Sequence, residues 1–123
     1  MRIGYDATAM LGPRTGIGVF VTELGRRLAV QPDTTLRAFA LTWRGRGELD
    51  GRSLPGAHIV RRPMAARPLR TAWLRADHPT IERWTGRVDV VHGPNYVVPP
   101  ARRAAEVVSV HDLTVLHHPE LCT

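Results

Sequence analysis

Two stretches near the start of the chain decide the fold class: RIGYD at residues 2–6 and GPRTGIG at residues 12–18. The first is a short, mostly apolar run that predicts a buried strand, and the second is a glycine-rich turn. A helix is predicted directly after the turn, since Phe20, Leu24 and Leu28 recur at helical spacing. This arrangement brings backbone N–H groups and the positive end of a helix dipole to the carboxyl edge of a sheet. Because phosphates bind at such places, the opening predicts a phosphorylated ligand.

The rest of the chain predicts further strands with few helices between them. Four more apolar runs predict strands at Leu36–Thr42, Ala57–Val60, Val88–His92 and Val107–His111. One or two short helices are predicted between Trp73 and Trp84, with Asp77 capping the second. The last two strands are continuously apolar rather than alternating, which indicates a sheet covered on both faces. The expected fold class is therefore α/β, with a Rossmann-like parallel sheet and flanking helices.

Composition limits the class of protein and its partners. The 123 residues suit one domain, and no apolar run is long enough to cross a bilayer. The first residues lack the layout of a secretory signal and the lone Cys122 allows no internal disulfide, so a cytoplasmic location is expected. The net charge of +6, from 17 arginines against 11 acidic residues, attracts phosphates, nucleic acid or acidic lipid. The arginines are spread out with few interleaved aromatic residues, so no nucleic-acid partner is predicted.

The glycine turn differs from the two best-known phosphate-binding motifs. No Gly-Lys-Ser/Thr follows it, which excludes a P-loop, and the spacing of Gly12, Gly16 and Gly18 does not fit a dinucleotide fingerprint. The second predicted strand ends in Thr42-Trp43, without an acidic residue to hold a ribose. Two interpretations stay open. Either the glycines let the backbone approach a sugar or diphosphate closely, or they serve only the turn and the packing of the helix.

Polar side chains follow the last two predicted strands. His92-Gly93-Pro94-Asn95-Tyr96 follows one strand, and His111-Asp112 follows the other. Because the carboxyl ends of parallel strands share one edge of the sheet, these side chains are expected near the glycine turn, where they would form a site. The adjacent His117 and His118 would face opposite ways in an extended chain, with no further ligand cluster nearby, so no metal site is predicted.

Four motifs resemble, in order and spacing, the N-terminal domain of GT-B glycosyltransferases, in particular the retaining, mannosyltransferase-like family 4. They are Arg2–Ala7, Gly12–Gly18, Val88–Asn95 and Val108–Leu113. The match extends over almost the whole chain and is weakest from Thr42 to Thr85. The resemblance implies that residues 1–123 are a truncated, acceptor-side half of a GT-B fold, without the C-terminal nucleotide-sugar-binding domain. The chain alone is then expected to be inactive.

The resemblance also implies roles for individual residues. Gly16, Ile17 and Gly18 match the loop that approaches the diphosphate and sugar of the donor. His111 matches a histidine that bonds a hydroxyl of the transferred sugar and helps to stabilise charge in the transition state. Asp112 follows it and orients the loop.

On the acceptor side the resemblance places His92, Asn95 and Tyr96. The implied reaction is transfer of a hexose, with mannose as one candidate, from a nucleotide sugar to a carbohydrate or lipid-linked acceptor with retention. No cofactor or metal is expected, because basic residues and a helix N-terminus stabilise the leaving diphosphate. The basic segment Arg61–Arg70 is a candidate for peripheral contact with an acidic membrane, at its inner face. The main alternative is a stand-alone Rossmann-like module that binds a phosphorylated ligand without catalysis.

Overall fold

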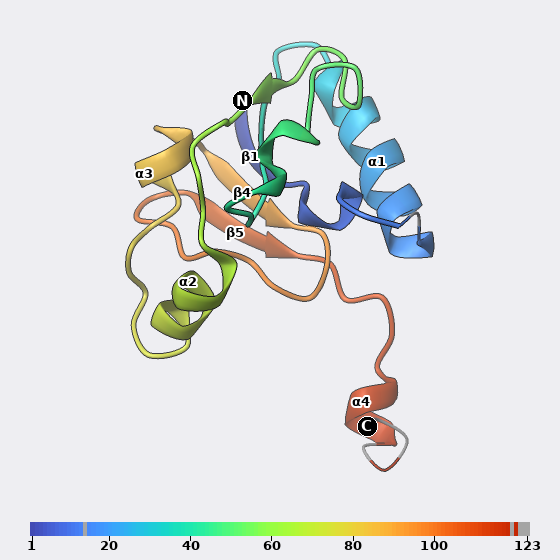
Figure 1. Cartoon of the computed structure of the whole chain (residues 1–123), viewed down its shortest axis with the longest axis vertical. Coiled ribbons are helices and arrows are strands. Elements are labelled where there is room, and N and C mark those ends of the chain that lie inside the picture. Colours follow the sequence, from blue (N-terminus) through green and yellow to red (C-terminus); the bar gives the residue numbers. More distant parts are fainter. Residues whose placement is uncertain (14, 119, 121–123) are drawn as a thin grey trace.

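A computed structural model describes residues 1–13, 15–118 and 120 (Figure 1). Its elements are, in chain order, β1 (Arg2–Asp6), α1 (Gly16–Ala29), β2 (Thr35–Phe39), β3 (His58–Ile59), α2 (Ala66–Trp73), α3 (Glu82–Thr85), β4 (Val90–Gly93), β5 (Ala105–Val108) and α4 (Thr114–His117). Short 3-10 turns lie at Thr8–Met10 and Gly45–Gly47. In the described part of the chain, no helix has the length and apolar character needed to span a membrane.

The five strands form one parallel sheet in the order β3-β2-β1-β4-β5. Gly4 in β1 lies between Arg37 of β2 and Val91 of β4. The chain moves outward from β1 through β2 to β3 and then returns to the other side of β1 to form β4 and β5. Such a reversal opens a crevice at the carboxyl ends of β1 and β4, which is where open α/β sheets bind ligands. The predicted α/β fold class, a Rossmann-like parallel sheet with flanking helices, is confirmed.

Helices lie on both faces of the sheet (Figure 1), and a separate apolar cluster packs on each face. Tyr5 and Leu36 belong to the cluster that packs against α1, and the Tyr5 hydroxyl donates a 2.7 Å hydrogen bond to the backbone oxygen of Val21. Phe39 and Val91 belong to the cluster on the other face, which includes side chains of α2 and α3. Burial raises the pKa of Tyr5, with a further contribution from the charge of Asp6. Packing of these two clusters thus fixes the middle of the sheet, around β1 and β2.

The glycine turn leads into α1 through a side-chain cap. Thr15 Oγ1 accepts a 3.0 Å hydrogen bond from the Gly18 amide, and Arg26 and Arg27 in the last turn complement the helix dipole. A Cβ atom on Gly25 would lie 2.8 Å from the side chain of Leu54, so the helix packs closely against the loop that follows β2. The helix therefore begins at a fixed point beside the sheet edge.

Three local predictions are corrected. β1 forms over the predicted residues, but β5 covers Ala105–Val108 instead of Val107–His111, because its ladder with β4 begins at the pair Ala105 and Val90. All four residues of β5 are exposed, so the sheet is not covered on both faces at this edge. The short helices form, but Asp77 caps neither: the N-cap of α3 is Ile81, whose amide donates to the backbone oxygen of Pro100 over 2.9 Å.

Candidate functional site

The segments that follow β4 and β5 meet the first turns of α1 at the carboxyl edge of the sheet. The rings of His111 and Phe20 lie edge to face with their centroids 5.0 Å apart, and Phe20 is in the second turn of α1. The rings of Tyr96 and His111 lie 5.6 Å apart in a similar geometry. His111 therefore lies beside the helix start and at the same end of the strands as Tyr96, as the positions of strand ends predict.

One ring nitrogen of His111 is fixed by the backbone. Its Nε2 lies 2.8 Å from the carbonyl oxygen of Pro94. Since a carbonyl oxygen only accepts hydrogen bonds, Nε2 carries the hydrogen. Nδ1 has no hydrogen-bond partner among the described residues, and the side chain is exposed. His111 thus offers Nδ1 to a ligand as an acceptor when neutral, or as a donor when protonated.

The loop after β4 is held in place by a glycine for which no other residue fits. A Cβ atom on Gly93 would lie 1.8 Å from the backbone oxygen of Val97, because the loop folds back over the end of the strand. Tyr96 takes a left-handed conformation with φ of 60°, and its amide donates a 3.0 Å hydrogen bond to the oxygen of Ser109. The Ser109 amide in turn donates to the oxygen of Gly93 over 3.0 Å. These bonds set the position of Tyr96 relative to the segment that carries His111.

Asp112 takes part in the same assembly mainly through its backbone. Its amide donates a 3.0 Å hydrogen bond to the Tyr96 hydroxyl, and its Oδ1 accepts a 2.8 Å hydrogen bond from the Thr114 amide. The second contact is an Asx turn that begins α4. Asp112 therefore connects Tyr96 to the chain after His111, and its part in orienting this loop stays a prediction.

His92 lies apart from the other residues expected on the acceptor side. Its Nε2 is 2.9 Å from the hydroxyl of Ser109, and its ring is 5.7 Å from that of Tyr5, on the face of the sheet that packs against α1. Burial lowers the pKa of His92, so the neutral form is favoured. These contacts connect β4 to the segment after β5, and a role for His92 in holding an acceptor stays a prediction.

A small hollow of about 80 Å³ lies at the end of β1, where the strand order reverses. Its polar lining residues are Asp6, Thr8, Asn95 and Arg70, the last from α2. Asp6 is almost fully buried at 8% exposure, and burial raises its pKa, while hydrogen bonds from Thr8 and the charge of Arg70 act in the opposite direction. Its Oδ1 accepts from the amide and hydroxyl of Thr8, and its Oδ2 has no hydrogen-bond partner in the described part of the chain. Asp6 can therefore accept a hydrogen bond from a ligand.

Two larger hollows border this one. A groove of about 350 Å³ shares Arg70 and Val97 with it and is also lined by Trp73, Leu74 and Tyr96. On the other side, a hollow of about 270 Å³ shares Ala9 with it and is lined by residues of the glycine turn and α1, including Gly12, Pro13 and Gly18. The predicted acceptor-side residues Asn95 and Tyr96 thus line adjoining hollows, and the predicted donor-side residue Gly18 lines the third.

The glycines of the turn have different physical roles. A Cβ atom on Gly18 would lie 2.8 Å from the oxygen of Ala9, and its amide is already bonded to Thr15, so Gly18 serves helix packing and the cap. Gly16 is exposed and has nothing within 4 Å of an added Cβ, and it begins the helix together with Ile17. The first amides of a helix have no partner within it. Gly16 therefore leaves open space at the start of the helix, while Gly18 fits the packing interpretation.

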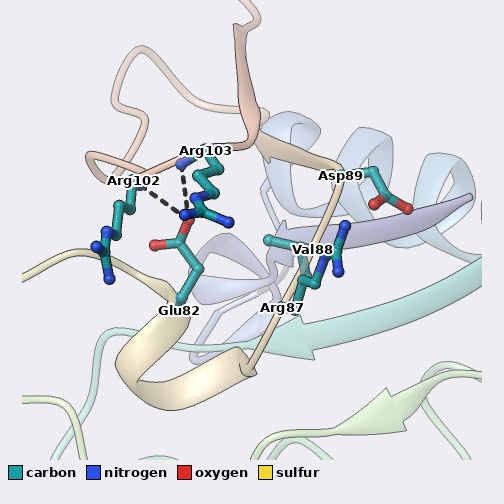
Figure 2. Close-up of a pocket in the computed structure, with 6 residues that line it drawn as sticks. All are labelled: Glu82, Arg87, Val88, Asp89, Arg102 and Arg103. Carbon is teal, nitrogen blue, oxygen red and sulfur yellow. Dashed lines mark hydrogen bonds between the residues drawn. The ribbon is translucent and has the colours of Figure 1, made fainter.

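A larger hollow lies elsewhere. It measures about 440 Å³ and is lined by Glu82, Arg87, Val88, Asp89, Arg102 and Arg103, just before β4 and β5 begin (Figure 2). This is the amino edge of the sheet, opposite the converging loops. Glu82 Oε1 accepts hydrogen bonds from the amides of Arg102 and Arg103 at 2.8 and 3.3 Å (Figure 2). Asp89 is bonded to Arg2 at 2.7 Å. The second oxygen of Glu82, Oε2, is buried and has no hydrogen-bond partner in the described part of the chain.

Thr8 and Arg70 belong to the site but were not predicted for it. Thr8 connects two strand ends, since its hydroxyl donates to Asp6 and accepts the Leu41 amide over 2.8 Å. Arg70 comes from α2, and its only signal in the sequence is membership of the basic segment 61–70. Among the described residues, no three His, Cys, Asp or Glu side chains lie close enough together to hold a metal ion. Arg14 and Cys122 lie outside the residues that the structure describes.

Compared with protein-family models, with curated proteins and with solved structures, the chain matches none of them.

Proposed function

We propose that this chain is the acceptor-side half of a retaining glycosyltransferase similar to GT-B family 4. The reaction would move a hexose from a nucleotide sugar to a carbohydrate or lipid-linked acceptor. The observation that carries the proposal is the meeting of His111, Tyr96 and the first turns of α1 at one edge of a parallel sheet. The motifs that resemble the family include His111 and the start of α1, and one of them ends directly before Tyr96.

The donor side of the proposed site is the start of α1. The first amides of α1, at Gly16 and Ile17, would receive a phosphate of the donor, where the helix dipole favours negative charge. Stabilising the charge that develops on the departing diphosphate lowers the barrier to transfer. In this arrangement Nδ1 of His111 accepts a hydrogen bond from a hydroxyl of the sugar, while Pro94 holds Nε2 and the ring orientation.

The acceptor side of the proposed site is the groove between α2 and the loop after β4. Its aromatic walls, Trp73 and Tyr96, offer apolar surface to the C–H faces of a sugar ring. The indole N–H of Trp73 donates to the oxygen of Pro79 over 2.9 Å, which fixes that wall. The adjoining small hollow offers Asp6 Oδ2 and Asn95 to acceptor hydroxyl groups.

A second candidate function is a Rossmann-like module that binds a phosphorylated ligand without catalysis. It is favoured by one observation: the open helix start at Gly16 needs no histidine to hold a phosphate. Under this alternative, the contacts of His111 with Pro94 and Phe20 serve packing alone.

The test uses the polypeptide encoded by the complete reading frame and this chain by itself. Each is mixed with a panel of nucleotide sugars, first in calorimetric titrations and then in transfer assays that follow nucleotide release and the anomeric configuration of the product by NMR. The proposal expects transfer with retention by the complete polypeptide and none by this chain, because a second domain would hold the nucleotide. Binding of phosphorylated ligands without transfer by the complete polypeptide would favour the module instead. Turnover by this chain alone would contradict the two-domain proposal.

A further inference from the structure

A separate hollow beside α3 is lined only by basic and uncharged residues. It measures about 320 Å³ and lies over β2 and the edge strand β3. Its ionisable lining residues are Arg37, His58, Arg61 and Arg62, and the remaining walls are Ile59, Val60, Trp84 and Thr85. None of these residues lines the hollows of the carboxyl edge. The hollow of Figure 2, by contrast, contains two carboxylates.

Arg37 is the fixed element of this hollow. It projects from the middle of β2, is half-buried, and donates from one Nη atom to the backbone oxygen of Thr85 at the end of α3. A Cβ atom on Gly86 would lie 2.9 Å from that Nη atom, so the guanidinium is closely packed. Its Nε is buried without a hydrogen-bond partner in the described part of the chain. No carboxylate of the described residues forms an ion pair with it. A half-buried cation without an anion is unfavourable, which favours an anionic ligand.

The other two arginines reach the hollow from the segment after β3. Arg62 donates a 2.9 Å hydrogen bond to the backbone oxygen of Arg83, which holds its side chain against α3. Arg61 is exposed and forms no hydrogen bond or ion pair through its side chain within the described residues. The wall is held by Trp84, whose indole N–H donates to the oxygen of Pro63 over 3.1 Å. Guanidinium groups from two separate segments therefore share one supported hollow.

We propose that this hollow is a binding site for a phosphoryl group. The planar donors of arginine match phosphate oxygens in pairs, and charge-assisted hydrogen bonds of this kind are stronger than neutral ones. Two sources carry the same chemistry: the headgroup of an acidic phospholipid and a soluble phosphorylated compound. The proposal does not depend on sugar transfer, because its residues are distinct from those of the carboxyl edge.

The test compares two adjacent arginine pairs that flank α3. The double variant Arg61→Gln/Arg62→Gln removes two charges from the proposed site, and Arg102→Gln/Arg103→Gln removes the same two charges from the hollow of Figure 2. Circular dichroism during thermal unfolding establishes that each variant is folded. If the variant Arg61→Gln/Arg62→Gln does not fold, the single variant Arg61→Gln, at an exposed position, is used in its place.

Two assays measure binding. Inorganic phosphate is titrated into the ¹⁵N-labelled chain while NMR follows the signals of Arg37 and Arg61. In parallel, the chain is sedimented with vesicles of phosphatidylglycerol and phosphatidylcholine, or of phosphatidylcholine alone.

The proposal expects saturable shifts at Arg37 and an affinity that falls about tenfold in the 61/62 variant but less than about twofold in the 102/103 variant. Saturation by phosphate without vesicle binding identifies a soluble ligand. Vesicle binding that requires phosphatidylglycerol and Arg61–Arg62 identifies a lipid headgroup. Equal losses in both double variants would overturn the proposal, because the net charge of +6 would then be the cause. The absence of any dependence on Arg61 and Arg62, in solution and on vesicles, would overturn it as well.

Discussion

The amino and carboxyl ends of the parallel strands differ in the kind of polar group that folding leaves without a partner. At the amino end, Asp89 is bonded to Arg2 and one oxygen of Glu82 is bonded to two backbone amides. The other oxygen of Glu82 is buried without a partner among the described residues, and the hollow there measures about 440 Å³. At the carboxyl end, His111 Nδ1 and Asp6 Oδ2 have no partner among the described residues, and the hollows are smaller. The carboxyl end thus leaves two kinds of group open, an imidazole nitrogen and a carboxylate oxygen, whereas the hollow at the amino end leaves one buried carboxylate oxygen. The size of a hollow alone does not identify a site here.

The largest effect is expected from Gly93→Ala, which tests whether the carboxyl end depends on its folded-back loop. The added Cβ atom would lie 1.8 Å from the backbone oxygen of Val97, so the loop has to move away from β4. We expect a loss of about 3 kcal/mol or more in the free energy of unfolding, measured by urea denaturation. The matched control is Gly51→Ala, at an exposed glycine where nothing lies within 4 Å of an added Cβ. Similar losses in the two variants would contradict the contact.

The second prediction concerns His111→Ala in the polypeptide of the complete reading frame. Loss of a group that bonds the transferred sugar is expected to lower kcat about a hundredfold with little change in KM. His78→Ala is the control, because His78 is exposed and lies in the segment after α2. Steady-state kinetics with the preferred nucleotide sugar measure both variants. A kcat for the His111 variant within a factor of two of the parent would remove this histidine from the chemistry and weaken the contrast between the two ends.

Asp6→Asn makes the comparison sharper, because it tests how much stability the buried carboxylate at the carboxyl end costs. A raised pKa in the folded state means that stability falls as pH rises from the ordinary value of 3.8 through the folded pKa. Asparagine keeps an oxygen for the bonds from Thr8 without the buried charge. We therefore expect a gain of roughly 1 kcal/mol near pH 7 that disappears near pH 3, measured by urea denaturation. The control is Asp33→Asn, in an exposed turn. If Asp6→Asn gave the same gain in stability at pH 7 and at pH 3, burial of the charge would not be the cause.

Asp89→Asn is expected to have the smallest effect and the opposite pH dependence. The side-chain hydrogen bond with Arg2 is the main reason that the pKa of Asp89 is lowered to about 2. A lowered folded pKa contributes stability above the ordinary value of 3.8, and this contribution is lost as pH falls toward 2. The variant should be less stable than the parent at pH 7 and equal to it near pH 2, with a smaller difference in high salt because the pair is exposed. Glu23→Gln, in the exposed pair with Arg26, is the control for a general loss of surface charge. A difference between parent and variant that stays constant from pH 7 to pH 2 would show that Arg2 does not hold this carboxylate.

The sequence predicted the fold best where the signals are local. The apolar run 2–6, the glycine turn and the periodic helix after it are adjacent in the chain, and β1 and α1 form there. The bounds of β5 could not be predicted in this way, because they are set by pairing with β4, some 15 residues earlier in the chain. The cap of α3 was missed for a related reason: a backbone bond from Ile81 to Pro100 decides where that segment turns.

For the site, the rule that parallel strands end at one edge was enough to bring His111 and Tyr96 together. It could not specify which groups remain open. Gly18 has the same residue type and neighbourhood as Gly16, yet only the structure distinguishes a packing glycine from an open one. Arg70 reaches the end of β1 from α2, and the position of α2 relative to β1 depends on tertiary packing that the local sequence does not encode. The cross-strand contact of His92 with Ser109 depended on the ladder between β4 and β5.

The exposed edge strand β5 has a consequence for how the proposed site at the carboxyl edge would lose a bound ligand. It pairs with β4 on one side only, and Ser109, His111 and Asp112 follow it directly. If the four residues of β5 detached from β4, these groups would lose their relative positions while the buried centre around Tyr5 and Leu36 remained intact. Such a local opening costs less free energy than unfolding of the whole domain. The affinity for a ligand of the proposed site is therefore expected to decrease under mild heating, well before the far-ultraviolet circular dichroism spectrum changes. If a neighbouring polypeptide added a strand alongside β5, it would hold β5 in the sheet and restore the affinity without contacting the ligand.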